Sequence, residues 1–173
     1  IIKLSKLDEG NVQLEKEEVD LYKLTREILT RLSPQAAKRK VHVEVTGEPV
    51  EYVGIRQILD EMIYNICENA IKYNHSGGKV TVNIHPSEEI TDTSTSVNYV
   101  FLEVSDTGIG IPPEYQEKIF TPFFRVDKSR SREMGGAGLG LALVREIAAL
   151  HGGTVQDEPA EGAGTVFTVA LPM

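Results

Sequence analysis

An acidic residue followed by closely spaced glycines ends one alternating apolar segment. Asp106 opens residues 106–112, of sequence DTGIGIP, directly after a predicted strand. A carboxylate at a strand end can accept a hydrogen bond from an exocyclic amine, and the two glycines let the backbone approach a flat ligand. Adenine offers such an amine, whereas guanine presents a carbonyl oxygen there, which a fixed carboxylate would repel. The same pattern is also typical of an Asp-initiated turn with glycine at positive φ.

Two amide side chains stand four residues apart in a long apolar helical pattern. Asn65 and Asn69 lie one above the other at the edge of the apolar stripe, between Glu61 and Lys72. Asparagine is a mediocre helix former that tends to hydrogen-bond to the backbone, so two of them beside the core face indicate a functional role. Capping a loop or facing water is the alternative, and it is the commoner explanation for an isolated pair.

A glycine-rich run, residues 135–140 of sequence GGAGLG, opens another predicted helix. Unpaired amides at a helix start, together with the helix dipole, favour a phosphate group, and glycines permit its close approach. The run lacks the Lys-Ser or Lys-Thr of a P-loop, and it does not fit the glycine spacing of the dinucleotide-binding fingerprint. A flexible linker is the alternative interpretation.

A basic segment follows a cluster of aromatic residues. Residues 120–125, of sequence FTPFFR, precede Lys128, Arg130 and Arg132. Aromatic side chains can anchor a flap at its base while cations reach phosphates, an arrangement that excludes water during group transfer. Few apolar residues follow, so we expect the flap to be mobile without a ligand. A solvated basic loop is the alternative.

Hydrophobic periodicity predicts the elements that carry these residues. We expect a helix over 55–74, with others over 21–38 and 140–151 and a short one starting in 113–120. Strands are expected over 41–45, 80–84, 100–104 and 165–171, with 12–19 extended, 86–96 a polar loop and 1–10 the end of a helix. The second and third strands should form an antiparallel hairpin. The segregation of helices and strands favours an α+β two-layer sandwich.

Bulk composition limits the protein's class. A chain of 173 residues is long enough for one well-buried core. The formal charge of −8 disfavours a nucleic-acid partner. Cys67 is the single cysteine, which excludes a disulfide framework and favours a buried thiol in the cytoplasm. No segment approaches the roughly 20 apolar residues needed to cross a bilayer, so any membrane anchor is expected outside this sequence.

Taken in chain order, the four motifs resemble the N, G1, F and G2 boxes of sensor histidine kinases, which belong to the GHKL ATPase group with gyrase, MutL and a heat-shock chaperone. The resemblance covers nearly the whole chain. It implies the GHKL (Bergerat) fold, with a mixed, mostly antiparallel sheet covered on one face by helices. Residues 1–10 would end the dimerisation and phosphoacceptor region, and 11–173 would form the catalytic ATP-binding domain with a lid at about 121–137.

The resemblance also implies ligands and roles. Asp106 would bind the adenine amine, with Thr165 assisting through a water, and Asn69 would coordinate Mg²⁺. Asn65, Arg125 and Lys128 would act on the transferred phosphoryl group. The full set of implied ATP-binding positions is Asn65, Asn69, Lys72, Tyr73, Asp106, Gly108, Ile109, Gly110, Arg125, Lys128, Gly136, Gly138, Leu139, Gly140 and Thr165.

One position favours phosphoryl transfer over hydrolysis. Gyrase-like ATPases place a glutamate base where Asn65 stands, and an amide cannot take that proton. We therefore expect transfer to a histidine of the dimerisation helices in a homodimeric parent, which signals to a response regulator and reaches the membrane through other segments. A hydrolysing GHKL ATPase using Glu61 or Glu68 is the alternative enzyme, and a nucleotide-binding module without chemistry is the alternative of another class.

The chain departs from the family pattern in two ways. None of its histidines, His42, His75, His85 and His151, lies in a helix ahead of the 4–10 tail, so the phosphoacceptor is expected to be absent. Ala137 stands where many relatives carry threonine, which removes a hydroxyl contact to phosphate.

Overall fold

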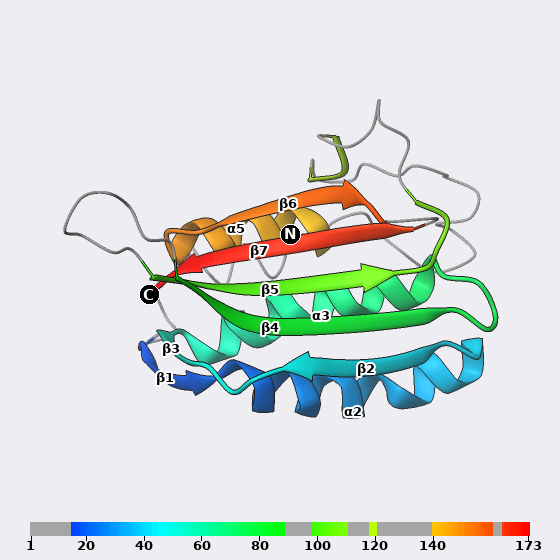
Figure 1. The fold of residues 1–173 in the computed structure, drawn as a ribbon, viewed down its shortest axis with the longest axis horizontal. Helices are drawn as coiled ribbons and strands as arrows, with labels where there is room; N and C mark the ends of the chain where they lie inside the picture. The colour runs from blue at the N-terminus through cyan, green and yellow to red at the C-terminus, as the bar shows by residue number, and fades with distance from the viewer. Residues whose placement is uncertain (1–14, 89–97, 111–117, 121–139, 161–163) are drawn as a thin grey trace.

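The computed structural model describes residues 15–88, 98–110, 118–120, 140–160 and 164–173. The described elements, in chain order, are β1 (Glu17–Asp20), α2 (Leu21–Arg39), β2 (His42–Gly47), β3 (Glu51–Gly54), α3 (Arg56–Lys72), β4 (Lys79–Glu88), β5 (Asn98–Asp106), the 3₁₀ turn η2 (Lys118–Phe120), α5 (Gly140–Leu150), β6 (Thr154–Pro159) and β7 (Thr165–Pro172) (Figure 1).

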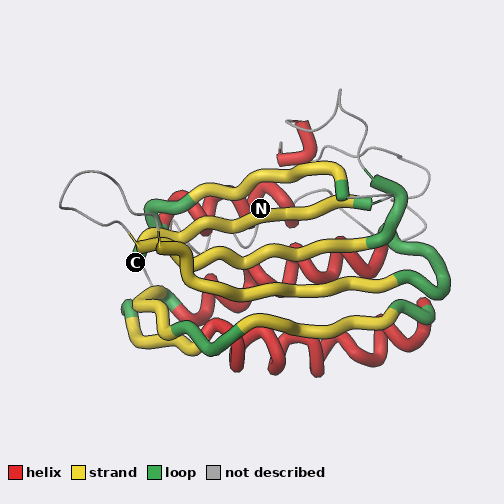
Figure 2. Tube along the Cα trace, viewed as in Figure 1, coloured by secondary structure: helices red, strands yellow, loops and turns green. Residues whose placement is uncertain are grey.

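Two layers make up the fold, as predicted. The five-stranded sheet has the order β2-β4-β5-β7-β6, and a separate ribbon pairs β1 with β3. β2 and β4 are parallel, whereas the other neighbours in the large sheet are antiparallel, including the predicted β4–β5 pair. Helices α2, α3 and α5 all lie behind the sheet in the views of Figures 1 and 2, so they cover the same face. This arrangement confirms the sandwich with a mixed, mostly antiparallel sheet.

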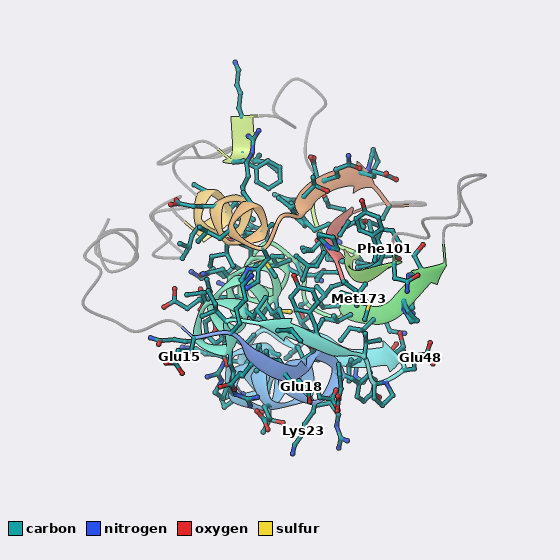
Figure 3. The ribbon with its side chains drawn as sticks, turned by 90° about the vertical axis from the view of Figure 1, so that its left-hand side faces the viewer. Glu15, Glu18, Lys23, Glu48, Phe101 and Met173 are labelled. Carbon is teal, nitrogen blue, oxygen red and sulfur yellow. The ribbon has the colours of Figure 1, made fainter. Side chains whose placement is uncertain are left out.

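Alternation along the strands places their apolar residues on the helical side. The register aligns Val82 with Val104 and Val104 with Phe167, so one row of buried side chains crosses three strands. Phe101, one position along from a buried residue on β5, lies on the opposite face of the sheet, away from α5 (Figure 3). The strand period of two therefore determines which face meets the helices.

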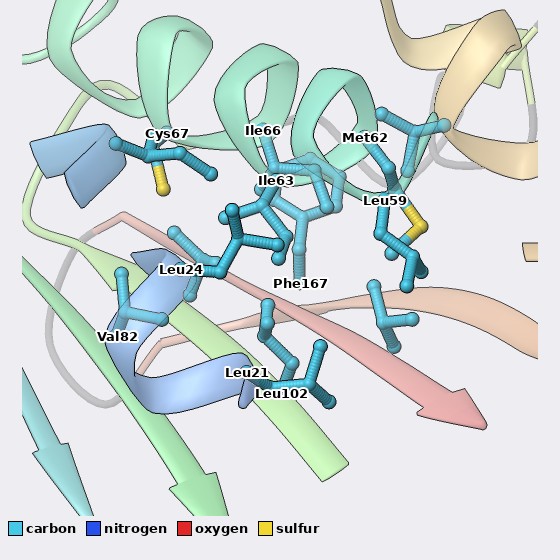
Figure 4. Packing of buried hydrophobic residues seen from close by; sticks show 14 of the residues in the cluster. Leu21, Leu24, Leu59, Met62, Ile63, Ile66, Cys67, Val82, Leu102 and Phe167 are labelled. Atoms are coloured by element: carbon cyan, nitrogen blue, oxygen red, sulfur yellow. The ribbon is translucent and has the colours of Figure 1, made fainter. Parts of the chain in front are cut away.

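Helix α3 is the centre of the core. Its stripe of Leu59, Met62, Ile63, Ile66 and Cys67 is almost fully buried and packs toward strand residues (Figure 4). The helix also contacts α2 and α5 on its two sides. Since each fully buried aliphatic side chain contributes about 1.5–3 kcal/mol, this stripe fixes the position of α3 strongly.

Two strands were not predicted. In β3, Tyr52 is the large apolar side chain that is buried, and β6 is mostly exposed along the sheet edge. Both are held by backbone pairing, to β1 and β7 respectively, which a side-chain pattern does not reveal.

The predicted polar loop begins too early, because β4 continues through Pro86 to Glu88, paired with β5. Proline is tolerated there since β2 pairs with β4 only as far as Ile84, so no second neighbour needs a donor at Pro86. Two other predicted features, the helix end at 1–10 and most of 113–120, lie outside the described residues.

Candidate functional site

The carboxylate of Asp106 is fixed at the end of β5 by two backbone donors. Its Oδ1 accepts hydrogen bonds from the N–H of Gly108 at 2.8 Å and from the N–H of Thr165 at 3.3 Å. Burial raises the pKa of Asp106 above its ordinary value of 3.8, against the opposing effect of these bonds and of nearby His75. Because both bonds use Oδ1, the second carboxylate oxygen is outside them and can accept from a ligand.

The backbone crosses itself closely beside this carboxylate. A Cβ added at Gly108 would lie 2.5 Å from the carbonyl oxygen of Tyr73, and one at Gly164 would lie 2.0 Å from the carbonyl oxygen of Asp106. Gly164 and Gly110 also have positive φ angles, of 103° and 74°. Glycine is therefore required for space at 108 and 164, and for conformation at 110 and 164. Gly164 was not among the predicted site residues, although a glycine just before a strand is a detectable signal.

The C-terminal end of α3 is joined to the segment after Asp106. The N–H of Ile109 donates to the carbonyl oxygen of Tyr73 at 3.2 Å. Ile109 keeps 44% of its surface exposed, which is high for a large apolar residue. The structure thus brings together Tyr73, Asp106, Gly108, Ile109 and Thr165, which the sequence predicts for one binding site. They combine an exposed apolar side chain with a half-buried acid.

The two asparagines of α3 are held differently. Asn65 is only 9% exposed, and its Nδ2 is a buried donor without a hydrogen-bond partner among the described residues. Asn69 directs its Nδ2 to the carbonyl oxygen of Asn65 at 3.1 Å, so its amide oxygen is the group left for a ligand. An unsatisfied buried donor is costly, which favours an acceptor from beyond the described residues.

One turn further along α3, Lys72 forms an ion pair with Glu68. Nζ and Oε1 are 3.6 Å apart, and the side chains are 18% and 25% exposed. Glu68 is therefore the i,i+4 partner of Lys72. A hydrolysing enzyme would need one carboxylate near the γ-phosphate, for which Glu68 and Glu61 are the two candidates. Glu61 forms no ion pair with another residue that the structure describes.

Helix α5 begins at Gly140, the last glycine of the predicted phosphate motif, and packs against α3. Val144, Ile147 and Ala148 form its buried stripe. The other predicted residues of this region, namely Arg125, Lys128, Gly136, Gly138 and Leu139, lie outside the described residues, as does the lid at 121–137.

His151, which follows α5, is engaged by the fold. It is 7% exposed, and its Nδ1 donates to the carbonyl oxygen of Ile147 at 2.9 Å. Its Nε2 accepts from the N–H of Ile55 at 3.1 Å, which assigns the neutral ring with the proton on Nδ1. Both nitrogens are occupied, so His151 joins α5 to the start of α3 and is not a surface nucleophile.

None of the helices among the described residues is long and apolar enough to span a membrane. Nor does that part of the chain gather three or more His, Cys, Asp or Glu side chains that could hold a metal ion.

Comparison with known proteins places this geometry among nucleotide-binding domains. Residues 54–173 match the family described as Histidine kinase-, DNA gyrase B-, and HSP90-like ATPase. Sensor histidine kinase WalK of Bacillus subtilis is 35% identical over 182 residues, which cover 99% of this chain and 27% of WalK. Sensor-like histidine kinase SenX3 of Mycobacterium tuberculosis is 35% identical over 99% of this chain and 40% of SenX3. The chain thus spans well under half the length of these curated relatives.

Solved structures agree with the sequence relatives. The mycobacterial sensor histidine kinase MprB superposes with a TM-score of 0.74 at 28% identity, covering 91% of this chain and 97% of that one. Full-length ShkA in complex with AMPPNP gives a TM-score of 0.76 at 26% identity, over 97% of this chain and 33% of ShkA.

Proposed function

Because this chain belongs to the family of histidine kinase-, DNA gyrase B- and HSP90-like ATPases, we propose that it is the ATP-binding catalytic domain of a sensor histidine kinase. In this role it binds ATP and transfers the γ-phosphoryl group to a histidine on the dimerisation helices of its parent protein. The observation that carries the proposal is the half-buried Asp106 carboxylate, held through one oxygen by Gly108 and Thr165.

The adenine ring is proposed to lie against Ile109 and Tyr73, with its exocyclic amine donating to Asp106. A carboxylate can accept from this amine but not donate to the carbonyl oxygen of guanine, so the site selects ATP over GTP. Thr165 supports this arrangement with its backbone N–H, at 3.3 Å from Oδ1. The water proposed between Thr165 and Asp106 would add to this direct contact.

The triphosphate is proposed to extend along α3 toward the start of α5. Lys72 and the unsatisfied Nδ2 of Asn65 supply donors for phosphate oxygens. The amide oxygen of Asn69 suits Mg²⁺, which prefers oxygen ligands and is commonly shared with substrate phosphates. When bound, Mg²⁺ neutralises phosphate charge. Arg125, Lys128, Gly136, Gly138, Leu139 and Gly140 are proposed to complete the phosphate site.

Transfer is favoured over hydrolysis by the chemistry of Asn65. Its amide cannot accept a proton from water, so ATP is held for a docked nucleophile and catalysis depends on positioning. The ion pair of Glu68 with Lys72 also favours transfer, because it holds the Glu68 carboxylate beside a cation of its own helix.

The proposal assigns partners as well. The nucleophile belongs to a homodimer of the parent kinase, and a response regulator is the eventual acceptor. The parent is proposed to be membrane-anchored through other segments, with this domain in the cytoplasm.

Phosphoryl transfer in trans tests the proposal. The domain and γ-labelled ATP are mixed with the separately produced dimerisation region of the parent, and acid-labile label on its histidine is measured beside released phosphate. We expect labelled histidine and slow phosphate release, both abolished by Asp106→Asn at limiting ATP. Rapid, steady phosphate release without labelling would instead support a hydrolysing ATPase.

A further inference from the structure

Asn74, the residue after Tyr73, is a buried polar side chain that the proposed chemistry does not use. It is 4% exposed, and its Nδ2 donates to the carbonyl oxygen of Lys79 at 3.1 Å. Its Oδ1 accepts from the N–H of His75 at 2.9 Å. Since a carbonyl can only accept and an N–H can only donate, these two partners assign the amide orientation.

Thr107, the residue after Asp106, meets the same amide. Its Oγ1 accepts from the N–H of Lys79 at 2.9 Å. The hydroxyl proton has two acceptors within reach, Oδ1 of Asn74 at 3.2 Å and, slightly farther, the carbonyl oxygen of Lys79 at 3.4 Å. The N–H of Thr107 also donates to the carbonyl oxygen of Lys79 at 3.2 Å. Thr107 therefore joins the strand carrying Asp106 both to β4 and to the end of α3.

The chain makes room for this contact at one position. A Cβ at Gly78 would lie 2.1 Å from Oδ1 of Asn74, which is closer than any real Cβ contact. Gly78 also closes the turn before β4, through its N–H to the carbonyl oxygen of His75 at 2.9 Å. Any larger residue at 78 would displace the Asn74 amide. The contact between Asn74 and Thr107 therefore also depends on Gly78, which distinguishes it from an incidental pair of surface residues.

We propose that Asn74 and Thr107 are positioning residues that hold Tyr73 and Asp106 at the separation that adenine requires, and so determine selectivity for the adenine base. The proposal rests on the proposed function, since it needs adenine to bind between those two residues. Each positioning residue follows a binding residue directly in the chain, so a shift of either one moves a wall of the site.

A purely structural role for the pair predicts a different result from a positioning role. Losing a structural hydrogen bond lowers stability but leaves the preference among bound bases unchanged. Misplacing Asp106 weakens its bond to the adenine amine and reduces its repulsion of a carbonyl oxygen. Inosine triphosphate carries such an oxygen in place of the amine, so the ratio of ATP to ITP affinity separates the two roles.

The chain offers a matched control. Nδ2 of Asn83 donates to Oγ1 of Thr46 at 3.0 Å, a threonine–asparagine contact between β4 and the edge strand β2 of the same sheet. Thr46→Val removes that hydroxyl away from the proposed site, whereas Thr107→Val removes the one beside Asp106. Thr107→Ser keeps the hydroxyl and serves as the rescue variant.

The experiment measures ATP and ITP dissociation constants by calorimetry for the whole chain and these variants, with thermal denaturation alongside. We expect Thr107→Val to lower the ATP-to-ITP affinity ratio about three- to tenfold, the usual worth of one hydrogen bond, with Ser restoring it and Thr46→Val leaving it unchanged. Asn74→Ala should lower the ratio as well, and the double variant no further.

Other results overturn the proposal. One such result is an ATP-to-ITP ratio in Thr107→Val equal to that in Thr46→Val, while wild type binds ATP and Asp106→Asn binds it more weakly. This result removes the positioning role and leaves the proposed function standing. Absence of ATP binding by the wild type removes both. Should valine at 107 prevent folding, Thr107→Ala, which only deletes atoms, gives the same comparison.

Discussion

The carboxylate of Asp106 and the backbone N–H of Thr165 meet at 3.3 Å, although 59 residues separate them in the chain. The contact joins the end of β5 to the start of β7, two neighbouring antiparallel strands. Gly164 makes it possible, because a side chain there would collide with the Asp106 backbone. Sheet pairing therefore positions a preformed acceptor at the end of β5, the middle strand of the sheet, where a ligand base can reach it.

Replacing Asp106 by asparagine should separate binding from stability. The amide oxygen keeps the bonds from Gly108 and Thr165, while the acceptor for the adenine amine is exchanged for a donor. We expect ATP affinity to fall about ten- to a hundredfold, or about 1.5–3 kcal/mol. The ligand-free protein should unfold at the same or a higher temperature, because a partly desolvated charge has been removed. Calorimetry with scanning fluorimetry measures both, and unchanged affinity would refute the adenine assignment.

The raised pKa of Asp106 predicts a pH dependence of stability. Burial raises its pKa in the folded state above the ordinary value of 3.8. At a pH between 3.8 and the folded-state pKa, the folded state therefore binds more protons than the unfolded state. The free energy of unfolding contributed by Asp106 therefore increases as pH falls through the folded pKa. Urea titrations of wild type and Asp106→Asn measure this effect. As the pH is lowered from neutral to about pH 4, the free energy of unfolding of the wild type should increase relative to that of the variant. A difference that stays constant would mean that the carboxyl is not desolvated.

Asn69→Ala should weaken nucleotide binding only where Mg²⁺ takes part. The variant loses the amide oxygen proposed as a metal ligand, while the adenine contacts remain. Titrations with ADP or a non-hydrolysable ATP analogue give the dissociation constants in Mg²⁺ and in EDTA. These two constants should differ for the wild type and become similar for the variant. Equal losses in both conditions would assign Asn69 a structural role through its bond to Asn65.

Most of the elements could be predicted because the spacing of their apolar side chains indicates which face is buried. The stripe of α3 and the alternation of β4, β5 and β7 match the periods of a helix and a strand, and the structure buries those residues. The order of the motifs and their family resemblance predict one site for Asp106, Tyr73 and Thr165. The structure brings these three residues close together.

Features that depend on backbone pairing or on distant neighbours could not be predicted. β3 and β6 are strands because β1 and β7 lie beside them, and their own side chains are largely polar or exposed. Asn74 and Thr107 are ordinary turn residues by type, and only the fold reveals their contact. The direct bond from the Thr165 N–H likewise follows from strand register rather than from residue chemistry.

Packing beneath the site predicts a contrast between two leucines. Leu59 of α3 is fully buried in the core, whereas Leu150 at the end of α5 is 53% exposed. Leu59→Ala should lower the free energy of unfolding by about 2–5 kcal/mol, from lost transfer energy and an unfilled cavity. Leu150→Ala should change it by about 0.5 kcal/mol or less. Chemical denaturation of both variants gives the comparison, and similar losses would contradict the placement of α3 in the core.

Cys67 offers a probe of α3 between the two asparagines. Its thiol is buried, and burial raises its pKa from 9.0 to about 12, which reduces the thiolate fraction near neutral pH about a thousandfold. Alkylating reagents should therefore modify the native protein only after unfolding, at a rate that rises with denaturant. Because nucleotide binds the folded state alone, a saturating ATP analogue with Mg²⁺ should slow the modification further. Fast labelling in the absence of denaturant, followed by mass spectrometry, would place Cys67 at the surface and α3 in a different orientation.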